Sequence, residues 1–345
     1  MIETLSKGVA QRLMNEYGKY RMPFFFLIDY QQEASVVLPM QDIDPLELQY
    51  NFHGLSNIEE FKPQPADFSF EAFPVSFDHY QKGFDLVQQH LLAGNSFLTN
   101  LTFPTPIDTN LGLEDIFIHS QAPYKLYWHN HFVVFSPEIF VRIKQGIISS
   151  YPMKGTIDAR LPNARERLLS DLKEKAEHAT IVDLIRNDLS MVATKVSVDS
   201  YRYLDKLQTS RGSLLQTSSR ISGQLDQNYH EQLGDIVFRL LPAGSISGAP
   251  KPKTVAIIQE AEAYNRGYYT GVFGHFDGTN LDSAVAIRFV EQQDSGLVYK
   301  SGGGITALSR VKEEYEELIQ KVYLPIAQRK NGYANTTPAF GKHPA

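Results

Sequence analysis

The chain of 345 residues contains no cysteine. This absence excludes disulfide bonds, thiolate catalysis and cysteine-ligated metal sites. The chain also lacks any hydrophobic run that approaches the length needed to cross a bilayer, and residues 1–7 contain no apolar core of a secretory signal. We therefore expect a cytoplasmic protein with no membrane segment.

An excess of positive charge is lacking as well, because 39 acidic residues outnumber 33 basic ones and the net charge is −6. Nucleic-acid binding requires a basic surface that neutralises phosphates, so we expect no nucleic-acid partner. An anionic ligand would have to be bound by local cations, helix ends or a metal ion. Apolar residues, by contrast, make up 42% of the chain and aromatic residues 12%. This supply is enough for one large domain or two ordinary ones.

Segments typical of strands and helices are interspersed along the chain without a regular alternation. The apolar runs 24–30 and 283–290 each predict a single buried strand. Apolar periodicity and charge pattern predict helices over residues 80–91, 163–188, 230–241, 251–263 and about 312–329. The helices are too few for repeated strand–helix–strand units, which favours a large α+β fold over a doubly wound one.

A proline-containing connector divides the chain unevenly. Pro63, Pro65 and Pro74 lie among polar and aromatic residues, as expected for a link between structural units. We therefore expect an N-terminal segment over residues 1–75 and a main domain over residues 76–328. The polar stretch from 329 to 345 is expected to be a disordered tail.

The segment 151–156 places one lysine, Lys154, between Pro152 and Gly155. Proline restricts the backbone and glycine permits a sharp turn or a close approach to a ligand. Lys154 is then either a solvated surface cation or a nucleophile activated by partial burial. From these residues alone the surface cation is the simpler interpretation.

Carboxylates recur on two predicted helices. Glu177 falls on an apolar helical stripe, so it either reaches past the stripe to water or projects into a cleft as a metal or proton ligand. Glu314, Glu317 and Lys321 share one face of the last predicted helix. That face is either a solvated, salt-bridged surface or a pair of carboxylates suited to Mg²⁺.

Two glycine-rich segments and one arginine could bind an anion. Residues 242–251 lead into a predicted helix and residues 301–305 follow a predicted strand, so backbone N–H groups could face a ligand at either place. Both segments could also be plain turns. Arg288, within the apolar run 283–290, would supply a bidentate donor to a carboxylate or pair with a buried acid.

Six sequence motifs occur in order at 136–138, 152–156, 181–189, 248–251, 286–288 and 301–305. This order resembles the chorismate-utilising enzymes, and among them component I of aminodeoxychorismate synthase. The resemblance extends from about residue 77 to 327, whereas the first 60 residues match only loosely. It implies an anthranilate-synthase-like α+β fold with large antiparallel sheets, and a chorismate-binding catalytic domain at 76–328. The acidic segment 314–317 and Lys321 follow the last motif.

The resemblance implies a nucleophilic role for Lys154. Aminodeoxychorismate synthases have lysine at this position, whereas anthranilate synthases usually have alanine. The amine would add to ring carbon 2 of chorismate while the 4-hydroxyl leaves, and ammonia would then add at carbon 4 and expel the lysine. We expect the pKa of Lys154 to be lowered by burial and by a nearby Mg²⁺. Glu138 matches the general acid or base that assists loss of the hydroxyl.

The remaining roles implied by the resemblance concern metal and substrate binding. Glu177 and Glu317 would bind Mg²⁺ directly and Glu314 through a water molecule. The substrate would be held by Gly155, Thr156, Arg288, Gly302, Gly303 and Lys321.

Three departures from the family pattern affect these expectations. Leu98 stands where isochorismate-forming and salicylate-forming relatives have a water-activating lysine, which argues against water as the nucleophile. His275 stands where many relatives have a tyrosine that grips the substrate, so His275 is the expected replacement. The N-terminal region lacks the Leu-Leu-Glu-Ser-type segment that lines a tryptophan pocket in anthranilate synthases, so no tryptophan inhibition is expected.

Ammonia must come from outside this chain, because the resemblance includes no glutamine amidotransferase domain and the chain has no cysteine. The source would be solution or a separate glutamine amidotransferase subunit, and a separate lyase would make 4-aminobenzoate for folate synthesis. One alternative is anthranilate synthase component I, against which Lys154 counts. A non-catalytic chorismate-binding protein is the other, against which the complete set of site residues counts.

Overall fold

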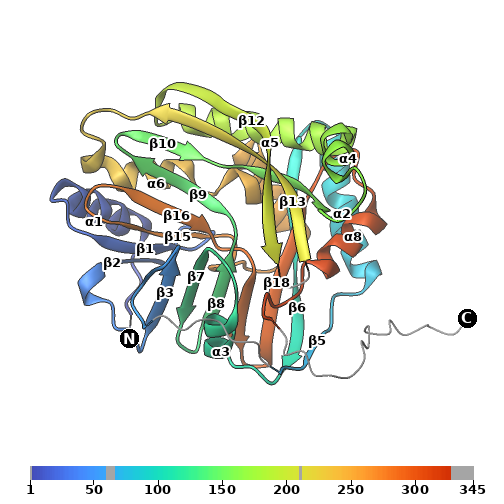
Figure 1. Ribbon diagram of the computed structural model, residues 1–345, viewed down its shortest axis with the longest axis horizontal. Helices are drawn as coiled ribbons and strands as arrows, with labels where there is room; N and C mark the ends of the chain where they lie inside the picture. The colour runs from blue at the N-terminus through green and yellow to red at the C-terminus, as the bar shows by residue number, and fades with distance from the viewer. Residues whose placement is uncertain (1, 60–66, 210–211, 328–345) are drawn as a thin grey trace, which may run out of the picture.

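The computed structural model describes residues 2–59, 67–209 and 212–327. Within these ranges the chain forms two nine-stranded antiparallel sheets and eight α-helices (Figure 1). The expectation of an α+β fold with large antiparallel sheets and flanking helices is confirmed. Among the same residues, no helix has both the length and the apolar composition needed to cross a bilayer.

The first sheet has the strand order β11-β13-β10-β9-β16-β15-β1-β2, and β12 pairs with β13 outside this path. Its longest pairing is the β12–β13 hairpin, which bends at several register shifts. The strands are β1 (Phe24–Ile28), β2 (Ser35–Pro39), β9 (Ile139–Lys144), β10 (Ile147–Ser150), β11 (Met153–Asp158), β12 (Thr194–Thr209), β13 (Gly212–Gln224), β15 (Val272–Phe276) and β16 (Leu281–Val285).

The second sheet has the order β14-β6-β18-β17-β8-β7-β3-β4, and β5 pairs with β6. Its long central pair is β6 with β18, which stay in register from Thr99 and Ile305 to Ile107 and Leu297. The strands are β3 (Leu48–Phe52), β4 (Leu55–Ser56), β5 (Phe70–Ala72), β6 (Leu98–Thr109), β7 (Tyr124–Trp128), β8 (Phe132–Ser136), β14 (Gly248–Ala249), β17 (Phe289–Gln293) and β18 (Gly296–Ile305).

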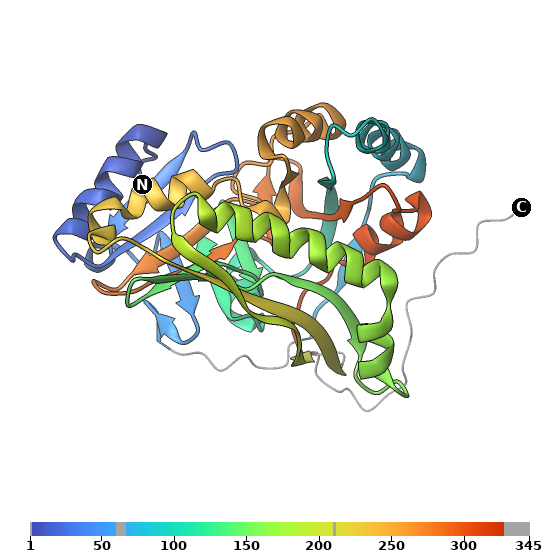
Figure 2. The ribbon, with the colours of Figure 1, turned by 90° about the horizontal axis from the view of Figure 1, so that it is seen from above.

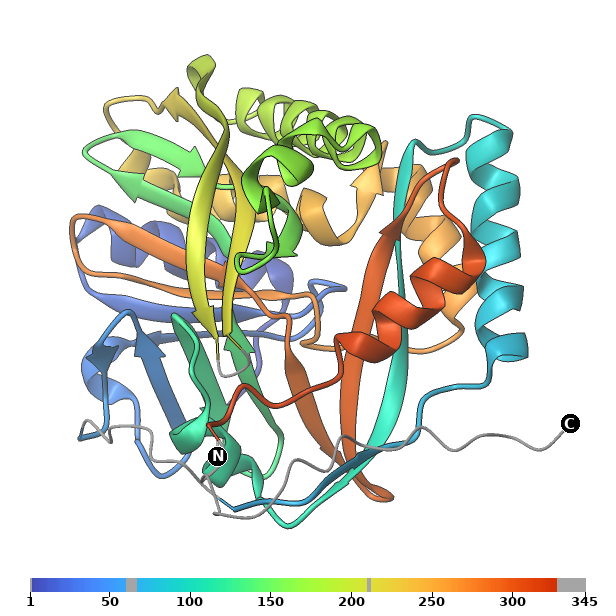
Figure 3. The ribbon, with the colours of Figure 1, turned by 45° about the vertical axis from the view of Figure 1, so that its right-hand side comes forward.

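The helices cover the outer faces of the two sheets. Figure 2 shows α5 alongside the long β12–β13 hairpin, and Figure 3 shows α2, α7 and α8 grouped beside β6 and β18. The α-helices are α1 (Lys7–Lys19), α2 (Phe77–Leu92), α3 (Leu113–His119), α4 (Ala164–Ser170), α5 (Leu172–Ser190), α6 (Leu233–Leu240), α7 (Lys251–Glu262) and α8 (Val311–Gln320). Three short 3-10 helices are η1 (Met40–Asp42), η2 (Tyr229–Gln232) and η3 (Gly244–Ile246).

Strand β1 explains why the run of apolar residues near the N-terminus is continuous. Phe24 and Phe26 pack into the core beneath α1, α5 and α6, whereas Phe25 and Leu27 pack into the core that the two sheets share. Successive side chains of a strand point to opposite faces, so a strand covered on both faces needs apolar residues at every position. All five residues of β1 are buried.

Two of the predicted helices have different bounds in the structure. The helix predicted over 163–188 is two helices, because the chain breaks at Asp171, whose carboxylate accepts from the Glu174 N–H and caps α5. The last helix ends at Gln320 and not near 329, and Pro325 follows in extended chain, where it cannot donate to a helix. The predicted tail at 329–345 lies outside the described residues.

The strands that precede residue 75 pair with strands that follow it. β1 lies between β2 and β15, β3 pairs with β7, and β5 pairs with β6. The division of the chain at residue 75 stays a prediction.

Replacing Phe25 should show how far the whole fold depends on the N-terminal segment. Its ring is fully buried and stacks on Tyr50 and Phe52. We expect Phe25→Ala to lower the free energy of unfolding by roughly 3–5 kcal/mol, measured by chemical denaturation. Tyr20→Ala, at a side chain 67% exposed, is the control and should change it by less than about 0.5 kcal/mol. A loss below about 1 kcal/mol for Phe25→Ala would mean that this strand contributes little to the shared core.

Candidate active site

The chain crosses from one sheet to the other at two neighbouring points. Glu138 stands between β8 of the second sheet and β9 of the first, and Arg288 stands between β16 of the first sheet and β17 of the second. The Val285 N–H donates to the Glu138 carbonyl at 3.1 Å, and the Phe135 N–H donates to the Arg288 carbonyl at 3.0 Å. The two crossings therefore support each other and place Glu138 and Arg288 where the sheets meet.

The prediction of one continuous strand over residues 283–290 is wrong. The strand is interrupted after Val285, and the Ile287 N–H turns back to the Val285 carbonyl. Arg288 has φ of 56°, a left-handed conformation that is uncommon for residues other than glycine. The turn redirects the chain from one sheet into the other, which places Arg288 beside a cavity and not within a strand.

An open cavity lies at this junction, with about 1040 Å³ of atom-free space that merges with solvent. Walls come from both sheets, from α5 and from the end of α8. The residues that line it are Leu98, Asn100, Pro137, Glu138, Met153, Lys154, Glu177, Ile181, Gln216, Ser245, Ile246, Tyr269, Ile287, Arg288, Lys300, Ser301, Gly302, Gly303, Gly304 and Lys321.

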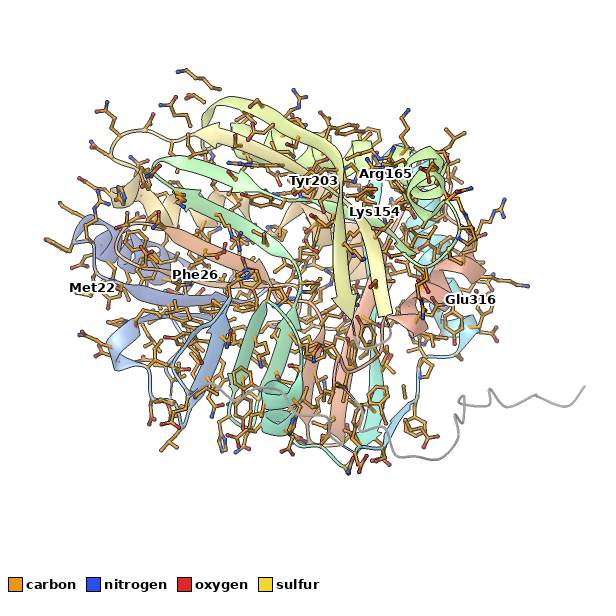
Figure 4. All side chains as sticks on the ribbon, in the orientation of Figure 1. Met22, Phe26, Lys154, Arg165, Tyr203 and Glu316 are labelled. Carbon is orange, nitrogen blue, oxygen red and sulfur yellow. The ribbon has the colours of Figure 1, made fainter. Side chains whose placement is uncertain are left out.

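Lys154 lies on β11, next to the β12–β13 hairpin with which β11 pairs (Figure 4). Its Nζ is 2.7 Å from a carboxylate oxygen of Glu177 on α5. Burial alone would lower the pKa of Lys154, but Glu177, Glu317 and Glu174 together outweigh burial and raise it. Three carboxylates stabilise the ammonium form, and the expectation that Mg²⁺ lowers this pKa stays a prediction. Lys154 must therefore give up a proton before it can act as a nucleophile.

Glu138 is the acid that the first crossing places in the cavity. Burial raises the pKa of its carboxyl group, although a hydrogen bond from the Ser245 hydroxyl and the charges of Lys321 and Arg288 oppose the rise. A carboxyl group with a raised pKa holds its proton at higher pH than usual and can therefore donate it to a leaving group.

Another part of the cavity wall offers cations and backbone groups. Burial lowers the pKa of Lys321, whose Nζ contacts Glu317 at 2.6 Å and donates to the Gly302 carbonyl at 2.8 Å. The guanidinium of Arg288 lies 5.3 Å from the centre of the Tyr323 ring. A Cβ added at Gly303 would be 3.5 Å from Glu317 and 3.6 Å from the Lys321 amine, so glycine leaves open space beside both. This wall suits a carboxylate ligand.

Four glutamates approach the same region, one more than the sequence predicted. Glu314 Oε2 would lie 3.7 Å from a Cβ on Gly303, beside Glu317. Glu174, one turn before Glu177 on α5, was not predicted; the charges of Lys154, Glu177 and Glu317 all act on its carboxyl group. Glu174 lies in the first turn of α5, within a charged stretch of sequence that is typical of a solvent-facing helix. Only the packing of α5 against β11 shows that its carboxylate is close to Lys154 and Glu177.

The donor chemistry of these glutamates fits a hard cation. Within residues 2–59, 67–209 and 212–327, no three acidic or histidine side chains are gathered into a complete metal site. Glu177 and Glu317 are each paired with a lysine instead. One oxygen of Glu174 is buried without a hydrogen-bond partner among the described residues, as expected for a group that awaits a cation. Carboxylate oxygens are the ligands that Mg²⁺ prefers.

Three predicted substrate contacts are not among the residues that line the cavity. His275 lies on β15, where its ring stacks on Phe52 at 5.1 Å in the core between the sheets. This separates His275 from the cavity and corrects the expectation that it replaces a substrate-gripping tyrosine. Gly155 packs against Glu174, since a Cβ added at Gly155 would lie 2.7 Å from the Glu174 carboxylate. Thr156 is exposed on β11.

The cavity also contains polar residues that sequence reasoning missed. Ser245 lies inside the segment 242–251, where the sequence points to a backbone anion site or a plain turn and gives no role to the serine. Tyr269 brings a tyrosine to the cavity from the loop before β15, a position that no motif indicates. Asn100 and Gln216 also line the cavity. Neither residue belongs to a recognisable motif, and a single amide side chain in a strand does not indicate a binding site.

The model of the chorismate binding enzyme family matches residues 24–326. The chain belongs to the chorismate-binding enzyme family. Its sequence is 55% identical to an uncharacterized PabA-like protein of Pasteurella multocida over 90% of this chain and 97% of that protein. Anthranilate synthase component 1 of Pseudomonas putida is 33% identical over 75% of this chain and 54% of its own length. Aminodeoxychorismate synthase component 1 of Bacillus subtilis is 29% identical over 76% of this chain and 58% of its own length.

Solved structures of other chorismate enzymes share the fold. Anthranilate synthase component I of Streptococcus pneumoniae matches with a TM-score of 0.61 and 26% identity, over 76% of this chain and 60% of that one. MenF, the menaquinone-specific isochorismate synthase of Escherichia coli, matches with a TM-score of 0.70 and 16% identity, over 93% of this chain and 82% of that one. The anthranilate-synthase-like fold is therefore confirmed.

A buried ion pair supports the loop that carries Ser245. Lys251 Nζ lies 2.8 Å from Asp188 and donates to the Leu240 carbonyl at 2.7 Å. A Cβ added at Gly244 would be 2.9 Å from Asp188, so the loop packs directly on the pair. The pair thus connects α5 to the wall beside Glu138.

Removing one member of this pair should be costly. We expect Asp188→Ala to lower the free energy of unfolding by roughly 3–5 kcal/mol, because Lys251 would stay buried without its partner. Asp183→Ala is the matched control on the same helix, since the Asp183–Arg186 pair is exposed and should contribute less than about 1 kcal/mol. Equal losses in the two variants, measured by denaturant titration, would contradict the structural role of Asp188.

Proposed function

We propose that the chain aminates chorismate at ring carbon 4 to give 4-amino-4-deoxychorismate, as component I of an aminodeoxychorismate synthase. The observation that carries the proposal is the position of Lys154, whose amine lies in the cavity that Glu138 and Arg288 also line. A relative of the chain bears the name aminodeoxychorismate synthase component 1. Relatives named anthranilate synthase component 1 make ortho-amination the second candidate.

The charges of the cavity match those of the substrate. Chorismate carries a ring carboxylate and an enolpyruvyl carboxylate. The wall formed by Arg288, Lys321 and the backbone of Gly303 would bind the enolpyruvyl carboxylate through charge-assisted hydrogen bonds. That arrangement places the ring toward Lys154 and Glu138.

The ring carboxylate would then face the glutamates. Glu177 and Glu317 would hold Mg²⁺ directly, with Glu314 and Glu174 in support. When bound, Mg²⁺ would neutralise and orient the ring carboxylate. Without such a cation, the carboxylates of enzyme and substrate would repel each other in a partly desolvated cavity.

The reaction proceeds through a covalent adduct on Lys154. The neutral amine forms a bond to ring carbon 2, both double bonds of the ring diene shift by one position around the ring, and the carbon 4–oxygen bond breaks. Glu138 gives its proton to the departing hydroxyl, which leaves as water. Ammonia then forms a bond to carbon 4, both double bonds shift back, and the bond between carbon 2 and Lys154 breaks, while the proton that the added nitrogen loses passes to a base of the cavity. The net change replaces a hydroxyl group by an amino group and releases one water.

Ammonia would reach the cavity from a separate glutamine amidotransferase subunit, or from ammonium in solution. The chain itself contains no cysteine to serve as a glutaminase nucleophile. The product would be the substrate of a separate lyase that forms 4-aminobenzoate for folate synthesis.

Product analysis tests the proposed reaction. Purified protein with chorismate, Mg²⁺ and ammonium chloride at mildly alkaline pH should form 4-amino-4-deoxychorismate, which an added lyase converts to 4-aminobenzoate. Chelation with EDTA should abolish turnover and excess Mg²⁺ should restore it. Anthranilate as the sole aminated product, identified by chromatography and mass, would assign the chain to ortho-amination and refute the proposal.

Lys154→Ala tests the covalent route. We expect para-amination to fall by roughly 10³-fold, because the variant lacks the nucleophile of the first step. Lys144→Ala is the control at an exposed lysine and should retain full activity. With ammonium withheld, intact-protein mass should show an adduct of chorismate minus one water on the unaltered chain and none on Lys154→Ala. Full para-amination by Lys154→Ala would exclude the adduct.

A further inference from the structure

Arg266 is one of the largest side chains that the fold buries completely, with 1% of its surface exposed. It follows α7, and its guanidinium pairs with a carboxylate at the end of that helix. Nε and Nη2 donate to the two oxygens of Glu262 at 2.8 Å and 2.6 Å. Nη1 donates to the Ile246 carbonyl at 3.0 Å, and Nη2 donates to the Asn100 carbonyl at 2.9 Å. One guanidinium therefore joins three separate segments of the chain.

The pair of Arg266 and Glu262 continues the edge of β6 past the end of a short strand. β14 pairs with only the first two residues of β6. Beyond them the Asn100 carbonyl accepts from Arg266, and the Thr102 N–H donates to Glu262 at 2.7 Å. Buried backbone groups need hydrogen-bond partners, and here two side chains provide them in place of a strand.

The groups bonded to Arg266 belong to the wall of the candidate active site. Asn100 and Ile246 both line the cavity. The Arg266 carbonyl accepts from the Lys300 amine at 3.0 Å and from the Tyr269 N–H at 3.2 Å, and these two residues line the cavity as well. A single buried residue thus connects β6, η3, β18 and the loop before β15 from behind the cavity.

The contact with η3 leads directly to the candidate acid. Ile246 is the neighbour of Ser245 in η3, and the Ser245 hydroxyl donates to the Glu138 carboxylate. A 3-10 helix of three residues has few hydrogen bonds of its own, so its position depends on contacts with other segments. The bond from Arg266 to the Ile246 carbonyl is such a contact.

Stability alone does not require a charged pair at this place. A buried ion pair loses through desolvation about as much as it gains through attraction, and apolar residues of similar volume often pack as stably. A guanidinium differs from an apolar group because its planar fork holds several acceptors at fixed distances. The pair therefore contributes geometry, and the geometry is that of the cavity wall.

We propose, on the basis of the proposed function, that Arg266 is a positioning residue for the amination. By joining the Ile246 carbonyl to the Asn100 carbonyl, its guanidinium holds η3 against β6 and keeps the Ser245 hydroxyl on Glu138. Arg266 is not among the residues that line the cavity, so it acts through Ser245 and not on the substrate.

Arg266→Lys tests this role, because lysine keeps the charge that Glu262 needs but lacks the fork that spans two carbonyls. We expect kcat for ammonium-dependent consumption of chorismate to fall about 10-fold, and KM for chorismate to change by less than about 2-fold. The KM is spared because the cations that would bind the carboxylates keep their contacts. Arg142→Lys is the matched control and should keep its kcat, since Arg142 bonds to Asp282 at 2.9 Å and is not a cavity residue.

A double-mutant cycle separates positioning from a general loosening of the fold. Ser245→Ala should lower kcat by a factor similar to that of Arg266→Lys. If Arg266 acts through Ser245, the double variant should lose about 10-fold and not about 100-fold, because the second change removes an interaction that is already lost.

Thr270→Val is a milder variant for the same cycle and leaves the ion pair with Glu262 in place. The Thr270 hydroxyl accepts from Nη1 of Arg266 at 3.2 Å, the nitrogen that also holds Ile246. We expect a loss in kcat of about 2–3-fold, and no further loss when Ser245→Ala is already present.

Hydrogen exchange gives a readout that needs no turnover. The segment 243–249 should exchange its amide hydrogens faster in Arg266→Lys than in the unaltered chain or in Arg142→Lys. Denaturant unfolding of each variant checks that it is folded.

Full kcat in a folded Arg266→Lys variant would overturn the proposal, as would losses that multiply in the double variant or unchanged exchange in the segment 243–249. Failure of the proposed function would be seen separately, as anthranilate in the product analysis of the unaltered chain. The cycle would stay interpretable in that case, because it follows the consumption of chorismate whichever isomer forms.

Discussion

The paired crossing of the chain between the two sheets is the constraint on which the site depends. Glu138 and Arg288 lie more than one hundred residues apart in the sequence, yet two backbone hydrogen bonds join the segments that carry them. Each segment leaves one sheet and enters the other, so neither can move without disturbing strands in both layers. The scaffold thus holds an acid and a cation close together in the wall of one cavity.

Charge balance is the second organising principle of the site. Lys154 and Lys321 are cations in partly desolvated surroundings, and Glu177 and Glu317 compensate for them at 2.7 Å and 2.6 Å. For each lysine, burial lowers the pKa of the amine and a paired carboxylate raises it. The net result is a raised pKa for Lys154 and a lowered pKa for Lys321. Three carboxylates act on Lys154, whereas Lys321 has Glu317 beside it but also the cations Lys154 and Arg288, which add to the effect of burial. A ligand that redistributes these charges would change which groups hold protons.

Much of the site could be predicted from the sequence because its residues lie within short motifs. Lys154 lies between proline and glycine, and Glu314 and Glu317 are spaced for one helical face, but it was the family resemblance that assigned their roles. The three successive glycines, expected after a strand, lie within β18 and pair with β6. Errors arose where long-range packing decides the outcome. His275 matched a motif position but faces the core between the sheets, because strand register decides which side of β15 it occupies. Gln216 had no motif, and its unsatisfied oxygen is visible only in the folded chain.

The sequence by itself determined the class of fold, most of the strands and helices, and the residues capable of acid, base and cation chemistry. These features depend on local periodicity and on residue type, both of which are present in the linear chain. Only the tertiary structure decided that the apolar run 283–290 is interrupted after Val285, that Lys154 is surrounded by carboxylates, and which side chains face the cavity. The physical reason is that direction and environment are set by contacts between segments far apart in sequence, and no local pattern encodes them.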